Sequence, residues 1–406
     1  MKNPKILAIV AGTLVLLAVG FLFMRSPKPI IEIKAEKIVD IGPFPLVNTY
    51  VTSFTVLIVL LVVAFLATRK IELIPGKLQN AVEAIMEALY NICVNTAGEK
   101  NGRRFFPLIA TIFVFIWIAN WMALLPFFNA IGTVSKVDAH HFHEEAVVFA
   151  SAGGVQFIKP NQKEVEFEVH EAACAAFEKD IVDAKAAGRD TGELKNLKED
   201  CITHERERAI NVVLPKAAGL SVDTSACKPL EGAEREVCVE DAKLARSEEA
   251  RAKLEADGKT LGILIPTFRS MNTDINSPLS IAIMAVIFIE FWGITALGFF
   301  KYAGKFLNFS SPINFVVGLI EFVAEVARLI SFTFRLFGNM LAGEILLLMM
   351  VFLIPFILAV PFYALEVFVG VIQAFVFALL TLVFGSLAAA AHDEHAEHAD
   401  AAAPAH

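Results

Sequence analysis

Charged side chains lie inside segments that are apolar enough to occupy a lipid bilayer. The clearest case is ISFTFRLFGNMLAGEILLLMM, residues 330–350, which carries Arg335, Asn339 and Glu344. Lipid cannot solvate ionisable groups, so those within a span are rare and usually functional. The charged residues of the predicted spans are Glu290, Glu321, Glu325, Arg328, Arg335, Glu344 and Glu366.

Helical geometry sorts most of these residues onto two faces of one predicted helix. At about 100° per residue, one stripe about 80° wide contains Glu321, Glu325, Arg328, Arg335 and Asn339. Glu344 follows Arg335 by nine residues, which is about 180° around the helix. The spacing therefore excludes a simple ion pair between Arg335 and Glu344 within this helix.

Arginine and glutamate suit two different tasks in such a helix. Arginine keeps its charge at any physiological pH and can attract a carboxylate or repel a cation. A buried glutamate can take up and release a proton. Together they form the parts of an ion-translocating device. The competing interpretation is a structural ion pair between helices. For Glu290 alone, an inter-helix hydrogen bond is an equal alternative, and Glu321 could mark the exposed start of its helix.

Composition places the chain among membrane proteins. Of its 406 residues, 56% are hydrophobic, and the mean hydropathy is +0.61. Residues 131–260 hold 26 of the 43 acidic residues but only 18 of the 35 basic ones, so the net charge of −8 arises in this segment. The pattern predicts an acidic soluble insert within a neutral membrane protein. No strongly basic face suggests nucleic acid, and no GxxxxGK[ST] motif indicates nucleotide binding.

Histidines and cysteines cluster outside the predicted spans. The sequences DAHHFHEEA (His140, His141, His143) and AHDEHAEHAD (His392, His395, His398) are weak metal-binding signals. A solvated loop and a disordered tail explain them better, so we predict no metal and no cofactor. Four of the five cysteines lie in the insert, which indicates an oxidising compartment. Proximity in sequence favours the pairs Cys174–Cys201 and Cys227–Cys238, and four reduced thiols are the alternative.

The amino-terminal part predicts a signal element and two spans. Residues 1–30 indicate a signal peptide or signal anchor. In the first membrane part, 31–130, the loop at 69–104 is basic: it contains Arg69, Lys70, Lys77, Lys100, Arg103 and Arg104. This loop should be cytoplasmic by the positive-inside tendency. The predicted elements of this part are a span at 51–67, an amphipathic surface helix at 75–95 and a span at 105–127.

The rest of the chain predicts an insert and a second membrane part. The insert covers 131–262 and contains charge-rich helices. The second membrane part, 263–390, contains a span at 278–299, a helix at 312–355 and a last helix at 361–390. The helix 312–355 would be roughly 66 Å long, against a bilayer core of about 30 Å, so we predict a strongly tilted helix that packs with the last one as a hairpin. Residues 391–406 form a cytoplasmic disordered, His-rich tail.

The predicted fold class is therefore an all-α polytopic membrane protein. It has about five main transmembrane helices and an N-terminal signal or anchor helix. A long tilted helical hairpin lies at its C-terminal end, and its external insert is mostly helical.

The stretch RLFGNMLAGE closely resembles the signature of subunit a of the membrane (Fo) sector of F-type ATP synthase. Further motifs agree in order and spacing and extend the resemblance over most of 31–390 outside the insert. They are AEKIVDIGPFPLVNTY, LIPGKLQNAVEAIMEALYN, RRFFPLIATIFVFIWIANWMALLP, NTDINSPLSIAIM and IQAFVFALLTLVF.

The resemblance implies a stator subunit with two offset half-channels that carry protons to and from a rotating c-ring. By position, Arg335 would be the essential charge facing the ring, with Asn339 and Gln373 beside it. The external half-channel would contain Glu344, Glu366 and Glu290. The cytoplasmic half-channel would contain Glu321 and Glu325. Asn120 and Ser331 would be supporting polar groups.

The resemblance also implies partners and a location. The partners would be the c-subunit ring, b-type peripheral stalk subunits and the lipid bilayer. The chain would translocate ions within a rotary complex rather than act as an enzyme alone. The location would be a bacterial inner membrane, with 131–262 on the periplasmic side.

Three features depart from the family pattern. Leu329 stands where a proline is common, and Ala123 stands where some members have an acidic residue. The insert is also unusual, and we interpret it as a contact domain for another subunit or a second synthase. Two other functions are weighed against this one. A secondary transporter would contain internal repeats, and a structural membrane anchor would not need Arg335.

Overall fold

The computed structural model describes most of the chain outside its two ends. The described residues are 12, 15, 35–41, 44–69, 76–139, 142, 145–152, 155–158, 164–169, 174–187, 190–306, 312–353 and 359–390. The predicted signal segment, apart from residues 12 and 15, lies outside them. So do the predicted tail and the histidines at 140, 141 and 143.

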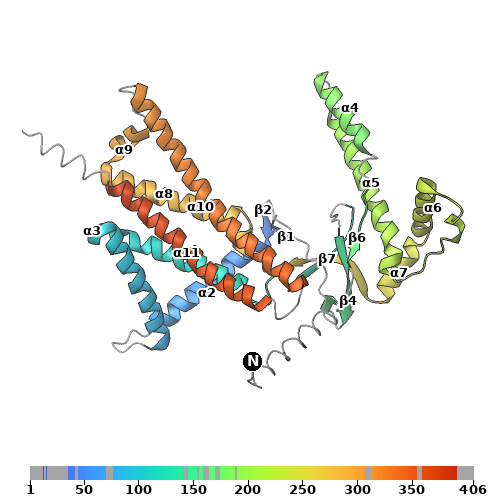
Figure 1. Cartoon of the computed structure of the whole chain (residues 1–406), viewed down its shortest axis with the longest axis horizontal. Coiled ribbons are helices and arrows are strands. Elements are labelled where there is room, and N and C mark those ends of the chain that lie inside the picture. Colours follow the sequence, from blue (N-terminus) through green and yellow to red (C-terminus); the bar gives the residue numbers. More distant parts are fainter. Residues whose placement is uncertain are drawn as a thin grey trace, which may run out of the picture. The chain divides into compact units, whose positions relative to one another are not determined.

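The chain forms two compact units. The insert unit comprises Gly132–Ile265 together with Met1–Ile30 and Met349–Leu358. The membrane unit comprises Ile31–Ile131, Pro266–Leu348 and Ala359–His406. Figure 1 shows the helices and strands of both units.

Within the described residues, five helices are long and apolar enough to cross a membrane. They are α2 (Asn48–Thr68), α3 (Lys77–Ala123), α8 (Asn276–Leu297), α10 (Pro312–Leu353) and α11 (Ala359–Ala390). Their outer surfaces are apolar; on α2, for example, Phe54, Leu61 and Phe65 are each more than 60% exposed. Water would not tolerate such a surface, whereas lipid does. The predicted polytopic helical membrane protein is confirmed at this level.

Helix α3 is two helices joined at a sharp bend. Gly98 has a φ of 77°, a backbone conformation that favours glycine, and it interrupts the helical geometry. Just beyond it, a Cβ on Gly102 would lie 2.6 Å from the Cys93 carbonyl oxygen. The first arm coincides with the amphipathic segment and the second with the apolar one. Figure 1 shows the two arms as a V.

Helix α10 is long and unbroken, and α11 packs along it in the opposite direction. Its 42 residues span about 63 Å at the α-helical rise. Phe332 on α10 stacks near Phe377 and Phe384 on α11, with ring centroids 4.9 and 5.9 Å apart. Later α10 residues meet earlier α11 residues, as Asn339 does with Gln373. Gly338 and Gly343 do not break the helix.

The core of the membrane unit lies where α3, α8, α10 and α11 meet. Phe105 of α3 stacks on Trp292 of α8 with centroids 4.0 Å apart. Ile116, Leu336 and Leu382 are completely buried in the same cluster. Shorter elements of this unit are the hairpin β1 (Lys37–Ile41) and β2 (Phe44–Val47), the 3₁₀ turn η3 (Met271–Thr273) and α9 (Phe299–Phe306).

The insert unit combines a sheet with helices. The sheet contains β3 (Gly132–Lys136), β4 (Glu145–Ala152), β5 (Val155–Ile158), β6 (Val165–Glu166) and β7 (Lys259–Pro266). The strand order is β3-β7-β4-β5, and β6 also pairs with β4. The helical part contains α4 (Ala175–Ala186), α5 (Gly192–Ala217), η2 (Ser225–Cys227), α6 (Gly232–Leu244) and α7 (Ser247–Ala256). The sequence-based expectation included these helices but not the sheet.

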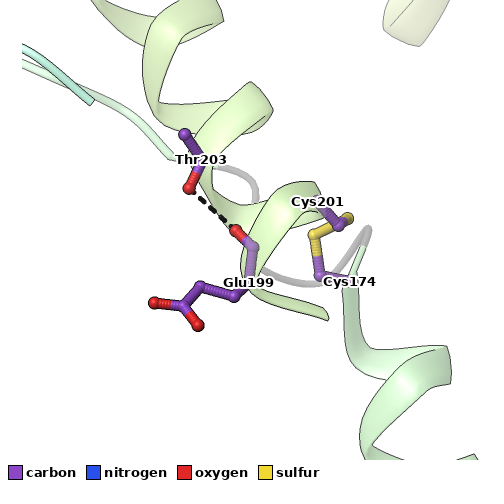
Figure 2. Close-up of a disulfide and its surroundings, with 4 residues drawn as sticks. All are labelled: Cys174, Glu199, Cys201 and Thr203. Carbon is purple, nitrogen blue, oxygen red and sulfur yellow. Dashed lines mark hydrogen bonds between the residues drawn. A yellow bond between two sulfur atoms is a disulfide. The ribbon is translucent and has the colours of Figure 1, made fainter. Parts of the chain in front are cut away.

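Two disulfides tie the helices of the insert unit together. Cys174, at the start of α4, is bonded to Cys201 of α5 (Figure 2). Cys227 of η2 is bonded to Cys238 of α6. These are the pairs that proximity in sequence favours. Cys93 is buried as a free thiol in α3.

Thiol counting tests this arrangement. We expect one alkylated cysteine per chain in denaturant without a reductant, because only Cys93 carries a free thiol. After reduction, all five cysteines should react. Intact mass spectrometry gives both counts. Five labels before reduction would contradict both disulfides.

Candidate ion-translocation site

Two arginines on the same stripe of α10 have very different surroundings. Arg328 donates to the Glu325 carboxylate at 2.5 Å and stacks 4.1 Å from the ring centroid of Phe384. Arg335 is half-buried and makes a long contact, 3.4 Å from Nη2 to Ser331 Oγ. No ion pair in the described part of the chain includes Arg335. Among the described residues, the charge of Arg328 is therefore compensated and that of Arg335 is not.

The surface of α10 around Arg335 is lined by small residues. Together with Arg335 they recur every three or four positions: Ala324, Ala327, Ser331, Gly338 and Ala342. Four of them are exposed, and Gly338 has open space where a Cβ would stand. Small side chains let another helix approach closely. The uncompensated charge thus lies on a face that a second helix can reach.

Asn339 and Gln373 connect α10 to α11 one turn beyond Arg335. Asn339 Nδ2 donates to Gln373 Oε1 at 2.6 Å. Gln373 is buried, whereas Asn339 is exposed on its helix. The pair fixes the two helices against each other beside the arginine.

Glu366 of α11 is a buried carboxyl that packs against Gly343 of α10. It is 6% exposed. A Cβ on Gly343 would overlap the Glu366 carboxyl group. A side chain at position 343 would therefore force the Glu366 carboxyl to move.

Glu344 meets a residue from outside α10. Asn129, in the segment after α3, donates through Nδ2 to Glu344 Oε1 at 2.7 Å. Glu344 Oε2 is buried and has no hydrogen-bond partner in the described part of the chain. As the helical spacing indicates, Glu344 and Arg335 contact different neighbours.

Glu290 lies in a different neighbourhood from Glu344 and Glu366. The Tyr302 hydroxyl donates to Glu290 Oε2 at 2.6 Å, and the tyrosine ring fills the space beside Gly293. Burial, and then this hydrogen bond, raise the pKa of the Tyr302 phenol. Tyr302 also interacts electrostatically with Glu325 and Arg328. The structure therefore groups Glu290 with Glu325.

Arg335 separates two groups of carboxyls along α10. By the helical rise, it lies about 14 Å from Glu344 and about 15 Å from Glu325. Glu366 belongs to the first group through Gly343, and Glu290 to the second through Tyr302. Glu321 lies one turn from Glu325 on the same stripe, and is half-buried.

Buried amides link α3 to the other helices. Asn120 Nδ2 donates to the Gly370 carbonyl at 3.1 Å, and its Oδ1 accepts from Asn272 Nδ2 at 2.7 Å. Both asparagines are completely buried. Nearby, Thr49 of α2 donates to Asp274 at 3.2 Å. These bonds replace lost contacts with water, so they position α2, α3, η3 and α11.

Sequence reasoning missed three residues that build this site: Asn129, Tyr302 and Asn272. Asn272 begins the motif NTDINSPLSIAIM, but the family resemblance implies no role for it. Asn129 and Tyr302 follow the ends of predicted spans, where polar residues are common. Only their tertiary contacts distinguish them.

Comparison with known proteins agrees with this geometry. The family model described as ATP synthase A chain matches residues 49–141 and 259–386, which together exceed half of the chain. The chain belongs to the ATP synthase A chain family. The unmatched residues between the two ranges correspond to most of the insert unit, so the family accounts for the membrane unit.

Relatives named ATP synthase subunit a give the same result. The chain is 37% identical over 135 residues to the one from Campylobacter jejuni subsp. jejuni serotype O:23/36 (strain 81-176), covering 32% of this chain and 58% of the relative. It is 36% identical over 132 residues to that of Campylobacter curvus (strain 525.92), with the same coverage. It is 35% identical over 124 residues to that of Helicobacter acinonychis (strain Sheeba), covering 30% of this chain and 54% of the relative. The chain thus spans a little over half the length of these relatives. The predicted resemblance to subunit a is confirmed.

Two glycines of the family signature offer a matched pair of substitutions. Gly343→Ala should displace the Glu366 carboxyl and destabilise the α10–α11 contact by about 1–3 kcal/mol. Gly338→Ala meets open space and should be neutral or stabilising by up to about 1 kcal/mol through helix propensity. Thermal unfolding of the solubilised protein compares them. Equal effects would contradict the close approach at Gly343.

Proposed function

We propose that this chain is the stator subunit a of an F-type ATP synthase. In this role it provides two offset half-channels for protons to and from a rotating c-ring, and couples proton flow to ATP synthesis. Its partners are the c-ring, b-type peripheral stalk subunits and the bilayer. Membership of the family supports this proposal, and the uncompensated charge of Arg335 carries it.

The environment of Arg335 supports its role at the ring. A fixed charge in a low-dielectric region is stable only with a partner. The exposed face of small residues leaves room for a helix that brings a carboxylate. Such a carboxylate would be held in its ionised form beside the arginine, which would also repel a proton moving directly between the half-channels. Arg328 cannot serve in this way because Glu325 already pairs with it.

The two groups of carboxyls support offset half-channels. Glu344 and Glu366 form the external one. Glu321 and Glu325 form the cytoplasmic one. The sequence-based expectation put Glu290 with the external group, but its contact with Tyr302 favours the cytoplasmic group. Four polar residues would support the site by their contacts. Asn339 and Gln373 bond to each other beside Arg335, Asn120 bonds to the Gly370 carbonyl, and Ser331 contacts Arg335.

Charge distribution and disulfides support one orientation. The chain would cross a bacterial inner membrane with the basic loop at 69–104 and the C-terminus in the cytoplasm. The insert would then be periplasmic, where its two disulfides form and persist.

The other candidate functions fit less well. A secondary transporter would need a second copy of the Arg335 region, and the sequence contains none. A structural anchor for the insert would require neither the buried carboxyls nor Arg335.

Replacement of Arg335 tests the central role. Arg335→Ala should abolish ATP-driven proton pumping in membrane vesicles, because the arriving carboxylate loses its counter-charge. Ser331→Ala removes only the 3.4 Å contact and should stay within about twofold of the unmodified protein. Quenching of a pH-sensitive dye reports pumping. Normal coupled pumping by the Arg335 variant would refute the proposal.

Deletion of the insert tests its separate role. We propose that the insert contacts a neighbouring subunit or a second synthase. Removal of 140–255 should therefore change the assembly or dimer pattern on native gels, while the Arg335 face stays intact. An unchanged pattern would rule out this contact role.

A further inference from the structure

Asn129, in the segment after α3, contacts the Glu344 carboxyl of α10. We propose that Asn129 is a positioning residue that holds the Glu344 carboxyl in both its ionised and its protonated form, so that protons enter and leave at this point. The inference rests on the proposed function of Glu344 in the external half-channel.

The backbone of Asn129 is held in an unusual conformation. Its φ is 57°, the only positive value at a non-glycine among the described residues. Asparagine tolerates this region better than most residues. The Asn129 N–H donates to the Phe268 carbonyl at 3.0 Å, and the Thr267 N–H donates to the Ile131 carbonyl at 2.9 Å. The loop is thus fixed, and its conformation directs the Asn129 amide to α10.

Aromatic packing stiffens the same loop. Phe128 is 6% exposed. Its ring centroid lies 5.3 Å from that of Phe127 and 5.7 Å from that of Phe268. Asn129 therefore belongs to a rigid segment and can orient a partner side chain.

Asn129 and Glu344 form one of the two hydrogen bonds that their side chains could form with each other. Asn129 Nδ2 donates to Glu344 Oε1 at 2.7 Å. Asn129 Oδ1 and Glu344 Oε2 are both buried, and neither has a hydrogen-bond partner in the described part of the chain. Both are acceptors while Glu344 is ionised, so neither can satisfy the other.

One proton on Glu344 Oε2 supplies the missing donor. A carboxylic acid and a primary amide can pair through two hydrogen bonds, N–H to one carboxyl oxygen and O–H to the amide oxygen. Asn129 neither gains nor loses a proton in this step. It offers a donor to the ionised form and an acceptor to the protonated form, so Glu344 keeps its place through each cycle.

The charged surroundings of Glu344 are limited. From α11, Glu366 reaches the adjacent Gly343. From the segment after α3, the neutral Asn129 reaches Glu344 itself. On α10, Arg335 lies on the opposite side of the helix. Among the described residues, an amide is therefore the group that holds this carboxyl, and a carboxylate in its place would repel it.

Exchange of the two groups tests the proposal. Asn129→Asp and Glu344→Gln, each alone, should lower passive proton conduction through the membrane sector about tenfold. The double variant Asn129→Asp/Glu344→Gln restores one amide and one carboxyl with exchanged positions. It should conduct several-fold better than Glu344→Gln alone. A double variant no better than Glu344→Gln would overturn the proposal, because a merely structural asparagine predicts no rescue.

Two further variants separate the side chain from the backbone. Asn129→Gly keeps the positive φ but removes the amide, so it too should conduct about tenfold less. Normal conduction by this variant would overturn the proposal. Asn80→Asp, on the exposed face of the first arm of α3, makes the same chemical change elsewhere and should have no effect. Native gels with immunoblotting confirm equal assembly of all variants.

Arg335→Ala in the same vesicles distinguishes the two proposals. If Arg335→Ala abolishes coupled pumping while Asn129→Asp conducts normally, only the proposed role of Asn129 is refuted. If Arg335→Ala pumps normally, the proposed function itself is refuted.

Discussion

The membrane unit is organised around one uncompensated charge. Burying a guanidinium costs several kcal/mol unless a counter-charge is near. For Arg328 the chain supplies both Glu325 and the face of Phe384. For Arg335, seven residues later on the same stripe, the described part of the chain supplies only Ser331 at 3.4 Å. The surrounding small residues leave this charge open to a partner helix, so the arrangement is consistent with the proposed binding and release of a carboxylate.

The rest of the unit keeps that charge in place. Amide hydrogen bonds hold α10 to α11 through Asn339 and Gln373, and α3 to α11 through Asn120. Such bonds are directional, and an unpaired amide in an apolar interior is costly, so they select one register. Apolar packing alone would tolerate sliding of these long helices.

Glycine also determines where the carboxyls lie. The Glu366 carboxyl fills the space at Gly343, and the Tyr302 ring that binds Glu290 fills the space at Gly293. A methyl group at either position would move a titratable side chain. The acidic groups on the two sides of Arg335 thus depend on backbone positions as well as on their own sequence.

The sequence by itself determined the helical membrane class, the family, the opposed faces of Arg335 and Glu344, and the long helix. These follow from local patterns, because hydrophobic runs and the helical repeat need no distant partner. The tertiary structure alone decided that Glu344 meets Asn129, that Glu290 meets Tyr302, and that the insert contains a sheet. The first contact joins residues 215 positions apart, and β4 pairs with β7 across the whole helical part of the insert. No local period encodes such pairs, because chain folding and not spacing brings them together.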